Sequence, residues 1–245
     1  MRRLWLSLLL VPIMVAAVAS AAWASPAAPA ARSAPAARTA SAAQARALQP
    51  GMSGSAVKAL QRRLAALKYY PGAIDGRFGT NTLEAVWAFY EVQGLTPHSY
   101  VSSAMKRALA HPRAPRKLVS HGGANRIEVS LYRGVLVLYR NNKVQLISHV
   151  STGGHYHYCS PGGGCGYAVT PTGNFHTVVF MRGWVHVPLG EMFNPVFFIG
   201  TAFAIHGDTD VPLAPVSHGC VRIPMDIANF FHKLVKIPGE PVYIR

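Results

Sequence analysis

The spacing of apolar residues changes once along this chain, and that change constrains the fold more than any other feature. Between residues 57 and 67, large apolar residues recur at intervals of three and four, the pattern of one buried helix face. In residues 126–131 (RIEVSL) and 134–140 (GVLVLYR) they alternate or run together, which is typical of strands. The sequence therefore predicts an α+β multidomain chain: a small three-helix bundle, then a mostly β domain with one C-terminal helix.

The helical bundle is predicted to cover residues 48–111. Its first helix ends at the Tyr-Pro-Gly turn of residues 70–72, and a tight loop at residues 75–79 (DGRFG) precedes the second. A third helix over residues 102–110 closes the bundle. The side chains able to cap the first two helices are Ser53 or Ser55, and Thr80 or Asn81.

The second domain is predicted to cover residues 116–245, with its chemistry on the connections between strands. Beyond the two runs above, strands are expected at residues 143–150, 174–181, 183–189, 197–207 and 241–245. Residues 225–236 (MDIANFFHKLVK) are the one segment that favours a helix, with Asp226 near its start and Gly239 after its end.

Residues 1–24 have the features of a signal peptide. Arg2 and Arg3 precede an uncharged apolar run, and the Ala-Trp-Ala of residues 22–24 supplies the small residues of a cleavage site. Residues 25–47 are rich in Ala and Pro and lack bulky apolar side chains, so we expect a semi-extended linker. We therefore expect an exported protein that acts outside the cytoplasm, with a membrane partner only if the first segment stays uncleaved.

The charge of the chain is strongly positive, with 24 Lys and Arg against 9 Asp and Glu. No basic cluster is interleaved with aromatic residues in a nucleic-acid motif, so nucleic acid is not expected as a partner. An anionic cell-surface polymer suits an exported basic protein better. The alternative is that the charge only keeps the protein soluble.

The chain has three cysteines, and exported proteins usually pair theirs. Cys159 and Cys165 flank a flexible Ser-Pro-Gly-Gly-Gly turn, which a disulfide can close. The competing interpretation is a zinc site of these two with His155 and His157, although close spacing in a Gly-rich loop is not a usual zinc template. We favour the disulfide and expect no metal, which leaves Cys220 without a partner.

The residues around Cys220 suit a nucleophilic thiol. In the SHGC segment of residues 217–220, backbone N–H groups lie beside the sulfur, where they can stabilise an oxyanion. The thiol needs an imidazole to take its proton, and both His206 and His218 are near in the sequence. In an extended backbone, His218 and Arg222 would share the face of Cys220, and Arg222 would hold a substrate carboxylate. Position alone does not choose between the two histidines.

Residues 48–111 resemble the three-helix peptidoglycan-binding domain found in many wall enzymes. The resemblance rests on the loop at residues 75–79 and departs from the family at Tyr90, where Gln is common. The other matching residues are Gly54, Val57, Leu60, Gln61, Leu64, Thr82, Ala85, Val86 and Phe89. The resemblance implies a domain that binds peptidoglycan, with a helical spacer of the same fold as the alternative.

The second domain resembles the catalytic domain of L,D-transpeptidases of the YkuD type. The resemblance is carried by residues 217–223 (SHGCVRI) with an upstream Ile-His-Gly at 205–207. Residues 151–153 (STG) and 170–175 (TPTGNF) are similar to two further family segments. The insertion at residues 154–167 is not a general family feature, and we expect it to form a disulfide-pinned lip beside the cleft.

This resemblance implies a cysteine acyltransferase that acts on peptidoglycan stem peptides without a metal or organic cofactor. Cys220 attacks the carbonyl between the diamino acid and D-Ala of a tetrapeptide, releases D-Ala, and passes its thioester to a neighbouring stem as a 3→3 cross-link. His206 is the base, oriented by a backbone carbonyl near Gly207. The other implied roles are an oxyanion hole from His218, Gly219 and Cys220, loop positioning by Ser217, donor binding by Arg222, and substrate contacts from Thr152, Gly153 and Gly207.

Three alternatives remain open at this point. If water replaces the amine that resolves the thioester, the protein is an L,D-carboxypeptidase or a peptidoglycan hydrolase. An inactive catalytic domain would leave a non-catalytic wall-binding protein. A zinc hydrolase built on His155, His157 and a cysteine would lack an obvious general-base carboxylate nearby.

Overall fold

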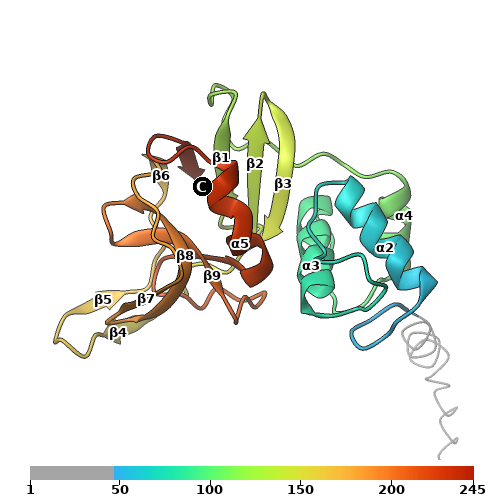
Figure 1. Cartoon of the computed structure of the whole chain (residues 1–245), viewed down its shortest axis with the longest axis horizontal. Coiled ribbons are helices and arrows are strands. Elements are labelled where there is room, and N and C mark those ends of the chain that lie inside the picture. Colours follow the sequence, from blue (N-terminus) through green and yellow to red (C-terminus); the bar gives the residue numbers. More distant parts are fainter. Residues whose placement is uncertain (1–46) are drawn as a thin grey trace, which may run out of the picture.

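A computed structural model describes residues 47–245 as a helical part and a mostly β part (Figure 1). Residues 1–46, which include the predicted signal peptide and all but the last residue of the predicted linker, lie outside the described residues. Within residues 47–245, no helix is both long enough and apolar enough to cross a membrane. The predicted architecture, three helices before a mostly β domain with one C-terminal helix, is confirmed.

The helical part consists of α2 (Ser55–Ala66), α3 (Thr80–Gln93) and α4 (Ser103–Ala110). The Ser102 hydroxyl caps α4, because it accepts a hydrogen bond from the Met105 N–H. The caps predicted for α2 and α3 are wrong: Gly54 and Gly79 precede these helices, and no side chain caps either one.

Backbone pairing around the loop at residues 75–79 explains the missing caps. The Gly54 N–H donates to the Gly76 carbonyl, and the Phe78 N–H donates to the Met52 carbonyl, each at 2.9 Å. These bonds fix the path of the chain at the start of α2 and just before α3. The two helix starts are therefore positioned by main-chain contacts instead of hydroxyl side chains.

The β part contains two main sheets (Figure 1). The first has the order β3-β2-β1-β11-β6, with β1 (Arg126–Ser130), β2 (Val135–Arg140), β3 (Lys143–His149), β6 (Gly173–His176) and β11 (Pro241–Ile244). The second has the order β10-β9-β8-β7, with β7 (Trp184–Val187), β8 (Gly190–Ile199), β9 (Phe203–Asp208) and β10 (Val221–Pro224). Helix α5 (Met225–Leu234) follows β10 directly and contacts β8, β9 and β10.

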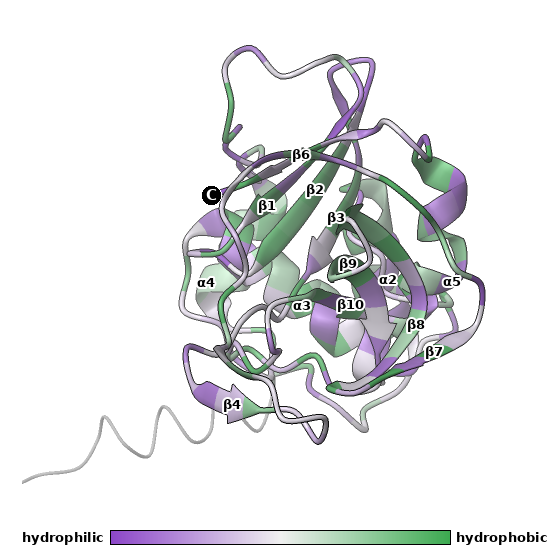
Figure 2. Ribbon diagram, turned by 90° about the vertical axis from the view of Figure 1, so that its left-hand side faces the viewer, coloured by the Kyte–Doolittle hydropathy of each residue, from purple (hydrophilic) through white to green (hydrophobic). Residues whose placement is uncertain are grey.

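Apolar residues from both sheets and α5 form the core of the β part. Leu136 of β2, Ile205 of β9, Ile223 of β10 and Phe231 of α5 are all buried in it. Figure 2 shows β2 as a hydrophobic ribbon in the interior of the fold. The strands β9 and β10, which flank the site described below, are therefore anchored in a well-packed hydrophobic core.

Two predicted strands differ from the structure. The run at residues 197–207, predicted as one strand, is the end of β8, a turn at Gly200 with φ 49°, and most of β9. The run at residues 174–181 is a strand only in its first part, within β6, because the N–H of Val178 bonds to the carbonyl of Phe197 in the second sheet. The chain thus crosses from one sheet to the other where the sequence shows an uninterrupted apolar pattern.

The helical and β parts share one hydrophobic core. Val135, Val137, Tyr139 and Ile147 of the first sheet pack with buried residues of α2 and α3. The N–H of Ile147 also donates to the carbonyl of Lys68, at 2.9 Å, in the segment that follows α2. The helices are therefore packed against the sheet as part of the same body, and α3 faces β3 in Figure 1.

Candidate active site

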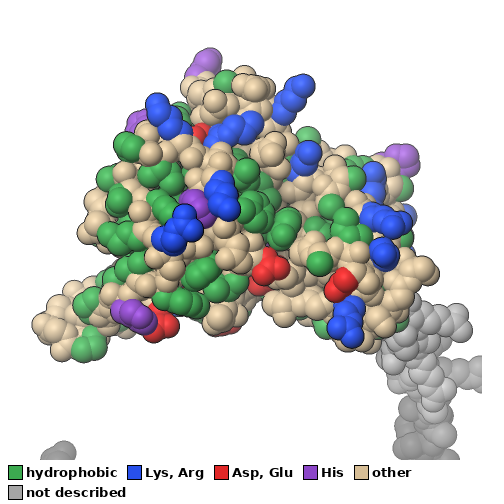
Figure 3. All heavy atoms as spheres, viewed as in Figure 1, with side chains coloured by type: hydrophobic (Ala, Val, Ile, Leu, Met, Phe, Trp, Pro, Cys, Tyr) green, Lys and Arg blue, Asp and Glu red, His purple; other side chains and the backbone are tan. Residues whose placement is uncertain are grey.

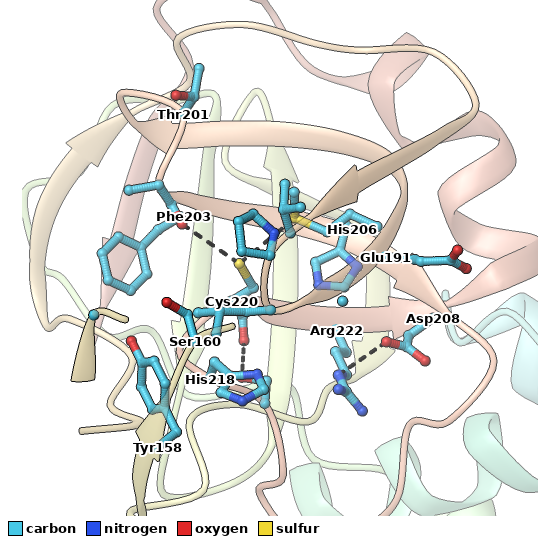
Figure 4. Close-up of a pocket in the computed structure, with 18 of the residues that line it drawn as sticks. Tyr158, Ser160, Glu191, Thr201, Phe203, His206, Asp208, His218, Cys220 and Arg222 are labelled. Atoms are coloured by element: carbon cyan, nitrogen blue, oxygen red, sulfur yellow. Dashed lines mark hydrogen bonds and ion pairs between the residues drawn. The ribbon is translucent and has the colours of Figure 1, made fainter. Parts of the chain in front are cut away.

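Cys220 lines a cavity of about 620 Å³ (Figure 4). The polar and ionisable side chains that line this cavity belong to Tyr158, Ser160, Glu191, Thr201, His206, Asp208, Ser217, His218, Cys220 and Arg222. Its larger apolar lining residues are Val187, Pro188, Leu189, Met192 and Phe203. The structure thus brings together five residues that the sequence selected from two separate segments: His206, Ser217, His218, Cys220 and Arg222.

Strands β9 and β10 place two of these side chains next to each other. The strands are parallel neighbours, and their register sets Arg222 opposite His206. Paired residues of adjacent strands share a face of the sheet, so both side chains reach the same cavity. Cys220 directly precedes β10, which brings the thiol to the same end of the site.

Residues 218–220 form a bend, and the Ser217 hydroxyl stabilises it. The hydroxyl accepts a hydrogen bond from the Gly219 N–H at 3.0 Å and donates one to the Cys220 carbonyl at 2.6 Å. The prediction that His218 and Cys220 share the face of an extended strand is therefore wrong, although both residues line the cavity. The Gly219 N–H is occupied by Ser217 within the bend.

Only glycine fits at position 219. Its φ of 142° is unfavourable for other residues, and an added Cβ would lie 2.6 Å from Cε1 of Phe203 and 2.8 Å from the Val169 carbonyl oxygen. The Thr170 hydroxyl donates to the Gly219 carbonyl at 2.8 Å and holds the bend from the other side. The position of the thiol therefore depends on close packing around Gly219.

The Cys220 sulfur is half-buried among main-chain and sulfur atoms. It lies 3.5 Å from the Ala204 nitrogen and 4.0 Å from both the Met192 sulfur and the Ala202 carbonyl oxygen. Burial raises the pKa of the Cys220 thiol above its ordinary value, against the opposing effects of the Ala204 N–H and the Arg222 charge. At neutral pH the resting residue is thus a protonated thiol, which needs a base to become a nucleophile.

His206 has the protonation state that a base requires. Its Nδ1 lies 2.9 Å from the Gly207 carbonyl oxygen, which can only accept, so Nδ1 carries a proton and donates it. Burial lowers the pKa of His206, while the Gly207 carbonyl and the Asp208 charge act in the opposite direction. The ring is therefore neutral near pH 7, with an unprotonated Nε2 that can accept a proton.

Arg222 is oriented by β9 and by the loop that follows it. Its Nε lies 3.1 Å from Oδ2 of Asp208, and its Nη1 donates to the Asp210 carbonyl at 3.2 Å. Asp208 follows His206 by two residues on β9 and therefore lies on the same face (Figure 4). The Nη1 bond uses part of the donor set of the guanidinium, and its other N–H groups, including the N–H of Nε, suit a carboxylate.

The insertion at residues 154–167 forms part of the cavity wall. Its strands β4 (His157–Cys159) and β5 (Cys165–Tyr167) pair with each other, and a disulfide joins Cys159 to Cys165. The structure thus agrees with the predicted disulfide, and the competing zinc site loses both of its sulfur ligands. Among residues 47–245, no group of three or more His, Cys, Asp or Glu side chains is arranged to hold a metal.

The insertion also contacts His218 through two tyrosines. The ring centroids of Tyr158 and His218 are 4.8 Å apart, and those of Tyr156 and His218 are 5.6 Å apart, both in edge-to-face geometry. The Tyr156 hydroxyl donates to the Val216 carbonyl at 3.2 Å. Burial, with a smaller effect of the Arg222 charge, lowers the pKa of His218. The insertion therefore holds a neutral His218 in place.

Three residues predicted to contact substrate lie outside the cavity lining. The Thr152 carbonyl accepts from the Ser217 N–H, and the Gly153 N–H donates to the Thr170 hydroxyl, each at 2.9 Å. Gly207 packs under α5, where an added Cβ would lie 2.6 Å from Cβ of Ala228. All three residues therefore help to hold lining residues in place without facing the cavity themselves.

Several lining residues were not identified from the sequence, among them Asp208, Met192, Phe203 and Tyr158. Asp208 has a signal, because it alternates with His206 along the strand β9. Met192 and Phe203 are apolar, and their sequence pattern does not distinguish them from core residues. Tyr158 is a lining residue only because the insertion folds back over the bend that carries His218.

The comparisons with protein families agree with both resemblances. A family model described as a peptidoglycan binding domain matches residues 53–109, and one described as an L,D-transpeptidase catalytic domain, YkuD, matches residues 124–244. A search of curated proteins found no match to this chain.

Two solved structures are similar to this chain to different degrees. An L,D-transpeptidase (residues 123–326) from Xylanimonas cellulosilytica is 31% identical, with a TM-score of 0.75 over 81% of this chain and 97% of that one. An L,D-transpeptidase from Stackebrandtia nassauensis is 18% identical, with a TM-score of 0.45 over 80% of this chain and 94% of that one. On the family match and the similarity to the Xylanimonas protein, this chain belongs to the L,D-transpeptidases with a YkuD-type catalytic domain.

Proposed function

We propose that this protein is an exported cysteine acyltransferase that forms 3→3 cross-links between peptidoglycan stem peptides. The observation that supports this most directly is one cavity lined by a protonated thiol, a neutral imidazole and an oriented guanidinium: Cys220, His206 and Arg222. These are the nucleophile, the base and the anion-binding group that acyl transfer from a peptide requires.

The first half-reaction forms a thioester. Cys220 Sγ attacks the carbonyl carbon between the diamino acid and D-Ala of a tetrapeptide stem, while its proton passes to Nε2 of His206. The carbon–nitrogen bond then breaks, and His206 returns the proton to the amine of the departing D-Ala. Arg222 binds a carboxylate of the donor, and Asp208 holds its guanidinium in place.

The oxyanion of this step is stabilised beside the bend at residues 218–220. We assign this role to the backbone N–H of Cys220 together with His218, because the Gly219 N–H is already donated to Ser217. Gly219 instead allows the close packing that places the thiol, and Ser217 holds the bend. The residues that help to hold the lining residues in place, without facing the cavity, are Thr152, Gly153 and Gly207.

The second half-reaction resolves the thioester. A side-chain amine of a neighbouring stem attacks the thioester carbon and loses a proton to His206. The carbon–sulfur bond then breaks, and His206 returns the proton to the departing Cys220 thiolate. The product is an amide between two stems. If water takes the place of the amine, the same thioester gives a trimmed stem, and the protein is an L,D-carboxypeptidase or a hydrolase.

In this proposal both parts bind peptidoglycan, and the protein acts outside the cytoplasm. The helical part binds the glycan strand, while the cavity acts on the stem peptides. In the view of Figure 3, Lys and Arg side chains are scattered over both parts and Asp and Glu side chains are few. With 24 basic against 9 acidic residues in the chain, this surface also suits anionic wall polymers.

The test is intact-mass analysis of the purified protein after incubation with a carbapenem, which mimics an acyl donor. We expect a single adduct that is absent in Cys220→Ala and forms slowly in His206→Ala. Walls incubated with the protein are then digested to separate 3→3 cross-linked dimers from trimmed tripeptides. A folded wild-type protein that forms no adduct would contradict the nucleophile and leave a wall-binding role.

A further inference from the structure

A buried pair of ionisable side chains joins the helical part to the β part. Glu91 lies on α3 and His149 ends β3, with 2.9 Å between Oε1 of Glu91 and Nδ1 of His149. The side chain of His149 is 0% exposed and that of Glu91 is 8% exposed. Burying ionisable groups costs desolvation free energy even when they pair with each other, and the reaction above uses neither residue.

The second ring nitrogen of His149 reaches the loop between β9 and β10. Its Nε2 lies 3.1 Å from the carbonyl oxygens of both Val211 and Pro212. Carbonyl oxygens only accept, so Nε2 carries a proton. Because Nδ1 faces a carboxyl group, Glu91 and His149 must share one further proton, as imidazolium and carboxylate or as imidazole and carboxylic acid.

The loop held by His149, residues 209–216, leads directly to the Cys220 bend. Its Asp210 carbonyl accepts from Nη1 of Arg222. Near its other end, the Ser151 hydroxyl donates to the Ala214 carbonyl at 2.8 Å and accepts from the Val216 N–H at 3.3 Å. The contacts of His149 therefore lie between the residue that orients Arg222 and the start of the bend.

We propose that Glu91 and His149 are positioning residues for acylation. Through their shared proton they fix the loop at residues 209–216, and the loop in turn fixes Arg222 beside Cys220. This inference rests on the proposed function and assigns the helical part a second role, which is to hold a loop of the catalytic site in place. When the shared proton is lost, one of two contacts fails: either the buried carboxylate faces the lone pair of Nδ1, or the ring proton moves to Nδ1 and Nε2 no longer donates to the loop.

Three charged residues lie near this pair. Glu84 on α3 raises the pKa of His149 through its charge. Arg133, in the turn between β1 and β2, donates to the Glu91 backbone carbonyl, and Asp210 lies in the loop that His149 contacts. Burial raises the pKa of Glu91 to about 7. Burial acts to lower the pKa of His149, but the hydrogen bond and charge of Glu91 raise it overall. Both shifts have the same sign: the folded pair keeps protons that the unfolded chain releases between the ordinary pKa values of Glu and His. Its contribution to stability is therefore present at acid pH and is lost as pH rises through neutral.

The experiment compares wild type with Glu91→Gln and Glu91→Ala in the carbapenem acylation of Cys220 from about pH 5.5 to 9. Gln can donate its amide N–H to Nδ1, so His149 keeps its proton on Nε2 at every pH and the pair no longer titrates. We expect the ratio of wild-type to Glu91→Gln rate to be constant below neutral pH and to fall on the order of tenfold above it. Effects of pH on Cys220 and His206 are common to both proteins and cancel in the ratio. Glu91→Ala removes the partner, and its rate should be lower at every pH.

The outcomes are distinguishable. A ratio that stays constant over the whole pH range, or equal losses in the Gln and Ala variants, would overturn the shared-proton proposal. Failure of Glu91→Gln to fold would also overturn it, since Gln preserves the hydrogen bonds. If wild type forms no adduct, the proposed function fails, and amide exchange of residues 209–216 then tests the pair alone. Exchange in wild type should rise with pH relative to exchange in Glu91→Gln. Equal exchange in the two proteins would contradict the role of the pair.

Discussion

Asp208 and Arg222 form an ion pair inside the cavity that holds Cys220, with 3.1 Å between Oδ2 and Nε. The two residues come from neighbouring parallel strands, and their side chains are 16% and 20% exposed. The guanidinium is therefore oriented before a substrate arrives, and a binding carboxylate meets donors that are already in position.

Replacing Asp208 by Asn should weaken binding of the donor peptide. Asn keeps the shape of the side chain but removes the charge that orients the guanidinium, so we expect KM for a tetrapeptide donor to rise about three- to tenfold. The change in kcat should be smaller. Steady-state release of D-Ala measures both constants. Glu191→Gln is the matched control, because Glu191 lines the same cavity but pairs with His186. An equal rise of KM in both variants would indicate a general charge effect instead.

Removing the Cys159–Cys165 disulfide should slow acylation with little change in overall stability. Strands β4 and β5 pair with each other and belong to neither main sheet, so loss of this hairpin leaves the core intact. Tyr158 would then leave His218, and we expect acylation of the Cys159→Ser, Cys165→Ser double variant to slow several-fold. Tyr158→Ala should reproduce this effect, whereas Tyr158→Phe keeps the ring and should not. A large fall in Tm of the double variant would show that the hairpin supports the fold itself.

Gly219→Ala should both destabilise the protein and inactivate it. The new methyl group would meet Phe203 and the Val169 carbonyl in a backbone conformation that disfavours alanine, at a cost of about 1–3 kcal/mol. Thermal unfolding measures the stability, and thiol alkylation measures the access to Cys220. Gly162→Ala is the control, because nothing lies within 4 Å of its added Cβ. Wild-type activity in Gly219→Ala would argue against the tight bend around the thiol.

The two pKa shifts at the site predict the pH dependence of thiol reactivity. The pKa of His206 lies below 6.5 and that of Cys220 above 9.0, both through burial, so a neutral imidazole and a protonated thiol coexist between these values. Alkylation of wild type by iodoacetamide should therefore be nearly constant through neutral pH and fall below pH 6.5. In His206→Ala, the rate should be lower at neutral pH and rise steeply toward pH 9 and above, because the thiolate must form by ionisation alone. Identical profiles would exclude His206 as the base.

A chain that contains only residues 116–245 should be less stable than the full chain and prone to aggregate. Without the helices, Val135, Val137, Tyr139 and Ile147 would be exposed as one apolar surface on the first sheet. Thermal unfolding and binding of a hydrophobic dye measure both effects. Residues 47–245 serve as the control, since they retain the shared core. An equally stable, monomeric short chain would show that the two parts fold independently.

Local sequence chemistry predicted the elements whose structure depends on near neighbours. The alternation in residues 126–140 matches β1 and β2, and the SHGC segment with its upstream histidine matches residues that β9 and β10 bring into one cavity. The turn at Gly200 and the change of sheet at Val178 were not predictable in this way, because they depend on pairing with distant strands.

The contacts between the two parts were even less accessible from sequence. Glu91 and His149 are 58 residues apart, and neither lies in a motif. The residues next to a carboxyl group on a helix do not indicate that packing will bring an imidazole to it. In the same way, the neighbours of Tyr158 in the sequence do not indicate its contact with His218, which forms only when the insertion folds.

Because Val137 and Ile147 lie in a core shared with the helices, the separation between the helical part and Cys220 is a constant of the fold. A glycan strand held by the helices would therefore present to the thiol only those stem peptides that lie at one fixed distance from the bound sugars.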